Sequence, residues 1–168
     1  MQSRPILHLF CGKAASGKST LAKALANEPG TILLREDFWL SGLFGDELTS
    51  LPDYVRYSAH LRRTITPHVI DLLQAGLSVV LDWPANTRKN RLWMRQLFEA
   101  AGSDHQLHVF DVPDEVCKAR LRRRNASGEH EFSVSEAAFD QISSYFQPPE
   151  KEEGFNLVLH TVDGCRQL

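Results

Sequence analysis

The amino-acid sequence predicts an α/β fold in which a five-stranded parallel β-sheet lies between two layers of helices, as a three-layer α/β/α sandwich. Short apolar segments of strand length alternate with helical patterns along the whole chain of 168 residues. The segment 77–82 is almost continuously apolar, which is typical of a strand covered by helices on both faces. A chain of this length is expected to form one domain, residues 1–168, with its own hydrophobic core.

Each expected element has sequence signals at its ends. The five expected strands are the apolar segments 6–11, 31–34, 77–82, 107–111 and 155–160. The expected helices are 20–26, 52–76, 88–101, 113–124 and 136–146. Gly102 should cap the third of these helices, and Pro67 should kink or split the second.

Residues 12–19 fit the pattern G-x-x-x-x-G-K-[ST] at every fixed position, between the first expected strand and the first expected helix. Gly12 and Gly17 permit backbone conformations that a Cβ atom would forbid, so that backbone N–H groups can surround phosphate oxygens. Lys18 would bring a positive charge to the outer phosphates, and Ser19 would offer its hydroxyl to Mg²⁺. The predicted nucleotide-phosphate site consists of Gly12, Lys13, Ala14, Ala15, Ser16, Gly17, Lys18, Ser19 and Thr20.

Asp37 follows the second expected strand, at the sheet edge where the phosphate loop should also lie. Its carboxylate could accept a proton from a substrate hydroxyl as that oxygen attacks the γ-phosphate of a nucleotide. The alternative is that Asp37 caps the N-terminus of a following helix.

Asp82 ends the third expected strand, where a carboxylate can orient Mg²⁺ or its bound waters. The alternative is a carboxylate that caps the next turn. The following residue is Trp83, whereas motor-type ATPases usually carry a glutamate there to activate water. This difference favours transfer of the phosphate to another molecule over steady hydrolysis.

Arg120, Arg123 and Arg124 close a helix just before the polar segment 125–133. Cations stabilise the charge on a migrating phosphoryl group, and a mobile lid over residues 121–134 could bring them in and exclude water. The alternative is a solvated helix end whose arginines favour the helix dipole. A second basic cluster, within residues 88–95, is more typical of a solvated helix face than of a substrate clamp.

Charge and composition narrow the classes of partner. Nineteen Lys and Arg against 21 Asp and Glu give a net charge of −2, which does not favour bulk binding to nucleic acid or anionic membranes. Three well-separated cysteines indicate a reducing compartment, so a cytoplasmic location is expected. No segment reaches the length of a transmembrane helix, and no membrane partner is expected.

These residues resemble those of the small phosphate-loop kinases. The resemblance is to the branch of predicted ATP-binding kinases related to polynucleotide kinase, chloramphenicol phosphotransferase and zeta toxin. It rests on residues 12–20, Asp37, residues 79–82 and the arginines at 120–124, and it extends over residues 5–160. It implies a nucleoside-kinase-like P-loop NTPase fold with strand order 2-3-1-4-5 and a lid. It also implies ATP and Mg²⁺ as ligands.

The resemblance also implies roles for single residues. Asp37 takes the position of the base, and Arg120 and Arg124 take the positions of lid arginines. Polynucleotide kinases carry an arginine three residues after the base, where this chain has Leu40. Trp39 and Leu40 therefore predict a more apolar acceptor pocket and make a nucleic-acid acceptor less favoured.

The sequence thus predicts an ATP-dependent phosphotransferase that moves the γ-phosphate of ATP to a hydroxyl of a small molecule. The predicted catalytic residues are Lys18, Asp37, Arg120 and Arg124, and the predicted Mg²⁺ ligands are Ser19 and Asp82. A polynucleotide 5′-hydroxyl kinase and a nucleotide-binding regulatory protein with little turnover remain alternatives. The sequence determines neither the acceptor nor the oligomeric state.

Overall fold

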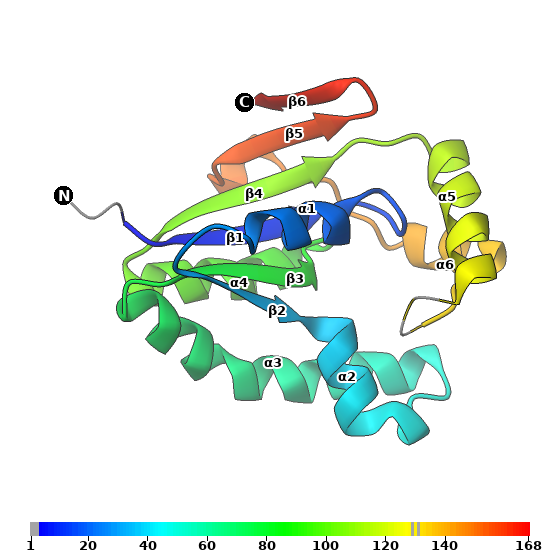
Figure 1. Ribbon diagram of the computed structural model, residues 1–168, viewed down its shortest axis with the longest axis horizontal. Coiled ribbons are helices and arrows are strands. Elements are labelled where there is room, and N and C mark those ends of the chain that lie inside the picture. Colours follow the sequence, from blue (N-terminus) through cyan, green and yellow to red (C-terminus); the bar gives the residue numbers. More distant parts are fainter. Residues whose placement is uncertain (1–3, 129, 131) are drawn as a thin grey trace.

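The computed structural model describes residues 4–128, 130 and 132–168 as an α/β sandwich (Figure 1). Residues 1–3 of the predicted domain and positions 129 and 131 of the predicted lid lie outside the described residues. The strands are β1 (Ile6–Cys11), β2 (Thr31–Arg35), β3 (Ser78–Pro84), β4 (Asp104–Phe110), β5 (Leu157–Thr161) and β6 (Gly164–Gln167). The helices are α1 (Lys18–Leu25), α2 (Glu36–Phe44), α3 (Leu51–Gln74), α4 (Arg88–Ala101), α5 (Asp114–Ser127) and α6 (Glu136–Ser143).

The sheet has six strands in the order β2-β3-β1-β4-β5-β6. The five predicted strands are parallel and follow the predicted order 2-3-1-4-5. The prediction of five strands is wrong, because β6 returns antiparallel to β5 after the two-residue turn 162–163. Every residue of β6 is exposed, so this edge strand lacks the apolar pattern that marks the other strands.

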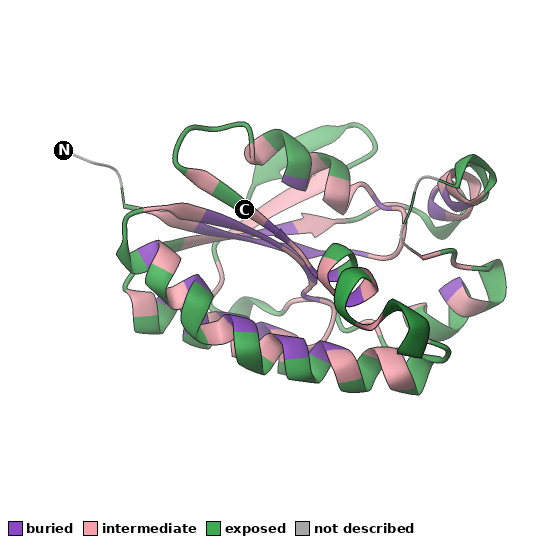
Figure 2. Ribbon diagram, turned by 60° about the horizontal axis from the view of Figure 1, so that its bottom comes forward, coloured by how far each residue is buried: buried purple, intermediate pink, exposed green. Residues whose placement is uncertain are grey.

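Figure 2 shows the buried strands of the sheet between helices. Alternating side chains of β1 face two different helical layers. Leu7 and Leu9 belong to the main core, together with residues of α3 and α4. Phe10 points to the opposite face, where it packs with Ala22 of α1 and Val80 of β3. The period of two in the strand therefore gives the central sheet two covered faces.

Helix α3 runs unbroken through Pro67, so the predicted split does not occur. Leu61, Ile65, Val69 and Leu73 recur every four residues on one side of the helix and are all buried. Packing of this apolar stripe against the core outweighs the hydrogen bond that the proline removes. Among the described residues, no helix is both long enough and apolar enough to cross a membrane.

Candidate functional site

The phosphate-loop segment turns sharply between β1 and α1. Gly17 has φ 112° at the N-terminus of α1, and Ala15 has φ 57°. A Cβ atom on Gly12 would lie 2.7 Å from Ser16 Oγ and 2.8 Å from Phe110 Cβ, so only glycine fits there. The loop is thus a closely packed backbone arc that ends at the positive end of α1, as an anion site requires.

Lys18 lies within this arc. Its Nζ atom donates hydrogen bonds to the carbonyl oxygens of Gly12, at 2.6 Å, and Lys13, at 2.7 Å. Desolvation lowers the pKa of Lys18 to about 8, although the Asp82 carboxylate acts to raise it. The ammonium group is therefore held at the loop, and an anionic phosphate beside it would favour its charged form.

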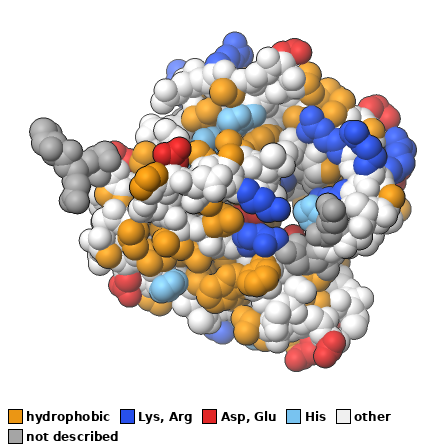
Figure 3. All heavy atoms as spheres, viewed as in Figure 1, with side chains coloured by type: hydrophobic (Ala, Val, Ile, Leu, Met, Phe, Trp, Pro, Cys, Tyr) orange, Lys and Arg blue, Asp and Glu red, His pale blue; other side chains and the backbone are white. Residues whose placement is uncertain are grey.

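Not every residue of the phosphate loop faces the cavity. Residues 14–20 line a cavity of about 1020 Å³, which opens on the face shown in Figure 3. The side chain of Lys13 instead turns to Asp114, with 2.6 Å between Nζ and Oδ1. Ser16 Oγ is buried without a hydrogen-bond partner among the described residues. This polar atom and the glycine arc fit a phosphate ligand.

Asn86 fastens the start of the loop. Its Oδ1 accepts from the backbone N–H of Gly12 at 2.8 Å, and its Nδ2 donates to the carbonyl of the same residue at 2.9 Å. The backbone of Asn86 is held in turn, because Gln147 N–H donates to its carbonyl at 2.8 Å. No sequence motif marks this contact, which joins residues 74 positions apart.

Arg91 of α4 anchors the segment that carries Asn86. It is 1% exposed and forms an ion pair with Glu153, with 2.7 Å between Nε and Oε2. It also donates to the carbonyls of Ala85 and Gln147, at 2.9 and 2.8 Å. The expectation that the basic cluster at 88–95 is a solvated face is therefore wrong for Arg91.

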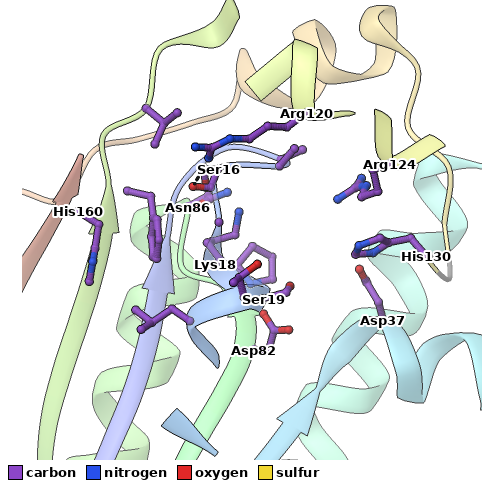
Figure 4. Close-up of a pocket in the computed structure, with 18 of the residues that line it drawn as sticks. Ser16, Lys18, Ser19, Asp37, Asp82, Asn86, Arg120, Arg124, His130 and His160 are labelled. Carbon is purple, nitrogen blue, oxygen red and sulfur yellow. Dashed lines mark hydrogen bonds between the residues drawn. The ribbon is translucent and has the colours of Figure 1, made fainter. Parts of the chain in front are cut away.

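Ser19 and Asp82 lie close together below Lys18 (Figure 4). Asp82 is inside β3, and Thr87 caps the following helix, so Asp82 is not the N-cap of that helix. A hydroxyl and a carboxylate are hard oxygen donors that suit Mg²⁺, which usually takes one or two protein ligands besides phosphates and water. The described residues contain no group of three or more His, Cys, Asp or Glu for a self-contained metal site.

Asp37 lies across the cavity from Lys18 and Ser19 (Figure 4). Helix α2 begins at Glu36, directly after β2, so Asp37 sits in the first helical turn and is not the N-cap residue. Its side chain accepts a hydrogen bond from Tyr54 Oη at 3.3 Å. The exposed carboxylate is therefore oriented toward the cavity by the neighbouring helix.

Sequence reasoning missed Glu36. This residue is 2% exposed, yet it also borders the cavity. Its carboxylate accepts hydrogen bonds from Tyr54 Oη, at 2.8 Å, and from Ser58 Oγ. Burial raises its pKa to about 7 against the lowering effect of these two hydrogen bonds. The only signal in the sequence was a second acid beside the candidate base.

Arg120 and Arg124 both lie on α5, which continues to Ser127, and both border the cavity. Arg120 Nη1 donates to the carbonyl of Ser16 at 3.2 Å, so it contacts the phosphate loop directly. Arg124 lies on the same side of the cavity as His130 and Asp37, above both of them (Figure 4). Arg123 is exposed and is not among the residues that line the cavity.

The predicted acceptor pocket is wrong in its lining. Leu40 is fully buried in the main core, and Trp39 packs against that core. Neither of them is among the residues that line the cavity. The lining near Asp37 comes instead from Arg35, Leu51 and Tyr54. The sequence placed Leu40 three residues after Asp37, but it did not indicate which side of the helix would be buried.

Comparison with known proteins identifies the family. The sequence profile of AAA_33, described as an AAA domain, matches residues 7–149. The chain belongs to this family. An adenylyl-sulfate kinase from Shewanella halifaxensis is 39% identical over 168 residues, which cover 96% of this chain and 76% of the relative. A second, from Shewanella pealeana, is 38% identical over 123 residues and is covered to 56% of its length.

Solved structures share the fold of this AAA_33 member. A candidate kinase from Chloroflexus aurantiacus has a TM-score of 0.75 at 23% identity, covering 96% of this chain and 87% of the other. The APS kinase of Mycobacterium tuberculosis in complex with AMPPNP and APS has a TM-score of 0.63 at 24% identity, covering 96% and 90%. The family and the curated relatives together support an ATP-dependent kinase.

Proposed function

We propose that this chain transfers the γ-phosphate of ATP to a hydroxyl group of a small-molecule acceptor. The position of Asp37 carries the proposal, because it borders the same cavity as the phosphate loop and lies across it from Lys18 and Ser19. A carboxylate that faces a bound nucleotide in this way is suited to accept the proton of an attacking hydroxyl.

In the transfer step, the acceptor oxygen bonds to the γ-phosphorus while the bond between that phosphorus and the β,γ-bridging oxygen breaks. Asp37 takes the hydroxyl proton, and ADP leaves. Lys18 and the N-terminus of α1 hold the phosphates, and Arg120 and Arg124 add positive charge over the migrating group. Ser19 and Asp82 would hold Mg²⁺, which neutralises phosphate charge when bound.

Residue 83 supports transfer over hydrolysis. Trp83 is 2% exposed and packs in the main core, so it does not border the cavity. The position after the candidate Mg²⁺ ligand therefore offers no carboxylate to activate water. A second molecule with a hydroxyl group is the better nucleophile for this site.

Adenylyl sulfate is the first acceptor to test, because the relative from Shewanella halifaxensis is named as its kinase. Labelling of a 5′-hydroxyl oligonucleotide in place of small molecules would favour a polynucleotide kinase instead. Tight ATP binding without transfer to any hydroxyl would favour the regulatory alternative.

Asp37→Asn tests the proposed base. We expect kcat for phosphate transfer to fall by about 10²–10⁴-fold, because the amide does not accept the hydroxyl proton. Calorimetry should show unchanged binding of ATP with Mg²⁺. Asp46→Asn, at an exposed acid beyond α2, is the matched control and should keep wild-type turnover. Wild-type turnover of Asp37→Asn would show that the base is misassigned.

A further inference from the structure

We infer that Tyr54 relays the proton taken up by Asp37 onto Glu36, so that the buried Glu36 is the proton store of the transfer step. The inference rests on the proposed function of Asp37. It assigns positioning roles to Tyr54 and Glu36, which have no place in the phosphate-loop motif.

Tyr54 Oη lies between the two carboxylates. It is 2.8 Å from Glu36 Oε2 and 3.3 Å from Asp37 Oδ1. A phenol has a single proton to donate, so it donates to one carboxylate at a time, and its oxygen can accept from the other acid once that acid is protonated. Hydrogen bonds of this kind are often long in unliganded sites and shorten when the substrate binds. The geometry therefore provides a continuous path for a proton between the two acids.

The two acids differ in access. Asp37 is exposed to the cavity, whereas Glu36 is 2% exposed and both of its oxygens accept hydrogen bonds. Glu36 borders the cavity, but its two carboxylate oxygens are already occupied by Tyr54 and Ser58. Asp37 can contact the substrate hydroxyl, and Tyr54 offers Glu36 a path to the proton that Asp37 takes up.

Burial also makes Glu36 a stronger base than an ordinary carboxylate. Desolvation raises its pKa to about 7, hydrogen bonds from Ser58 and Tyr54 lower it, Asp37 raises it and Arg62 lowers it. A group with a pKa near 7 holds a proton at neutral pH better than a carboxylate of ordinary acidity. Uptake of a proton also relieves the cost of a buried negative charge.

Each proton that moves in the relay has a donor and an acceptor. The acceptor O–H bond breaks as a bond to Asp37 oxygen forms. Asp37 then passes this proton to Tyr54 Oη while Tyr54 passes its own proton to Glu36 Oε2. Asp37 and Tyr54 return to their starting forms, and Glu36 holds one proton, which returns to solvent by the reverse path through Tyr54 and Asp37 once the product has left. Glu36 must be ionised at the start, so transfer should slow as the pH falls through about 7.

The pH dependence of kcat, from pH 5.5 to 9 with the acceptor that gives transfer, tests the relay. The wild-type rate should fall toward low pH with a midpoint near 7. In Tyr54→Phe and Glu36→Gln that midpoint should disappear, and the plateau rate should drop by about tenfold. In Ser58→Ala the midpoint should move to higher pH, because a hydrogen bond that lowers the pKa of Glu36 is lost.

Tyr57→Phe is the matched control, because Tyr57 is also on α3 but its hydroxyl bonds to Glu47. It should keep the wild-type profile. A wild-type midpoint in both Tyr54→Phe and Glu36→Gln would overturn the relay. If Asp37→Asn is inactive in that case, the proposed base stands and only the relay fails. If Asp37→Asn keeps wild-type turnover, or if no hydroxyl acceptor gives transfer, the proposed function fails and the relay with it.

Discussion

The two sides of the central cavity are built from different kinds of contact. On the donor side, residues 12–20 are contiguous in sequence, and glycine conformations shape them. On the acceptor side, Asp37, Tyr54 and Arg124 come from three separate helices. The proposed phosphate site is thus encoded locally, whereas the proposed base and its surroundings depend on tertiary contacts.

The donor side also depends on Arg91, which is distant in sequence and holds the segment that carries Asn86. Arg91→Ala should remove these contacts. Removal of Arg91 leaves the largely buried Glu153 carboxylate without its ion-pair partner. We expect the free energy of unfolding to fall by about 3–5 kcal/mol, measured by urea denaturation. Arg88→Ala is the control, because its pair with Glu150 is exposed and should contribute about 0–1 kcal/mol. Equal losses in the two variants would contradict this account.

Lys18→Ala tests the function of the donor side of the cavity. We expect kcat to fall by about 10²–10³-fold, because the cation that faces the phosphates is lost. Thermal stabilisation by ATP with Mg²⁺ should also disappear. Lys89→Ala, an exposed change on α4, should leave both unaffected. Unchanged stabilisation by ATP in Lys18→Ala would disprove the phosphate-loop assignment.

Beside the donor site, three histidines connect neighbouring strands. His8 Nδ1 is 3.2 Å from His108 Nε2, and His108 Nδ1 is 3.0 Å from His160 Nε2. Burial lowers the pKa of His108 from 6.5 to about 3. As the pH falls below 6.5, the unfolded chain therefore binds a proton here that the folded chain does not bind until about pH 3. The folded state should lose stability across that window.

From pH 7.5 to pH 5, the loss from His108 should be about 2 kcal/mol in the free energy of unfolding. His108→Gln should reduce this slope in urea denaturation at a series of pH values. Glu36→Gln should make the loss steeper, because the raised pKa of Glu36 stabilises the folded state as the pH falls from about 7 toward the unfolded value and so opposes the loss from His108. An unchanged slope in His108→Gln would contradict the assignment.

Asn86→Ala should have the smallest effect. The loss of two hydrogen bonds to Gly12 frees the start of the loop, and we expect the Kd for ATP to rise by about tenfold. Asn156→Ala, at an exposed position beside His105, should not change it. An unchanged Kd in Asn86→Ala would show that the loop keeps its shape without this clamp.

The parallel core of the fold could be predicted because buried strands and helix stops leave local signals. The strand order of β1–β5 followed from the resemblance, and the phosphate loop followed from its motif. The exposed strand β6 gave no apolar pattern, and Pro67 suggested a break that packing prevents. Local sequence signals do not predict an element whose structure depends on tertiary contacts.

The candidate site shows the same limit. Residues 12–20 were found from their motif, and Asp37 was found because it follows a strand. Glu36 and Asn86 were missed because their importance comes from burial and from partners far away in the sequence. Leu40 was assigned to the acceptor pocket, but α2 turns it into the core.

The fate of the γ-phosphate of ATP distinguishes transfer to an acceptor from hydrolysis. The wild-type protein is incubated with γ-labelled ATP, Mg²⁺ and adenylyl sulfate or a panel of hydroxyl metabolites, and labelled products are separated. We expect label to pass to an organic phosphate ester at a rate that depends on the acceptor, and we expect this transfer to be lost in Asp37→Asn. Release of label only as inorganic phosphate, at a rate independent of every acceptor, would contradict this expectation.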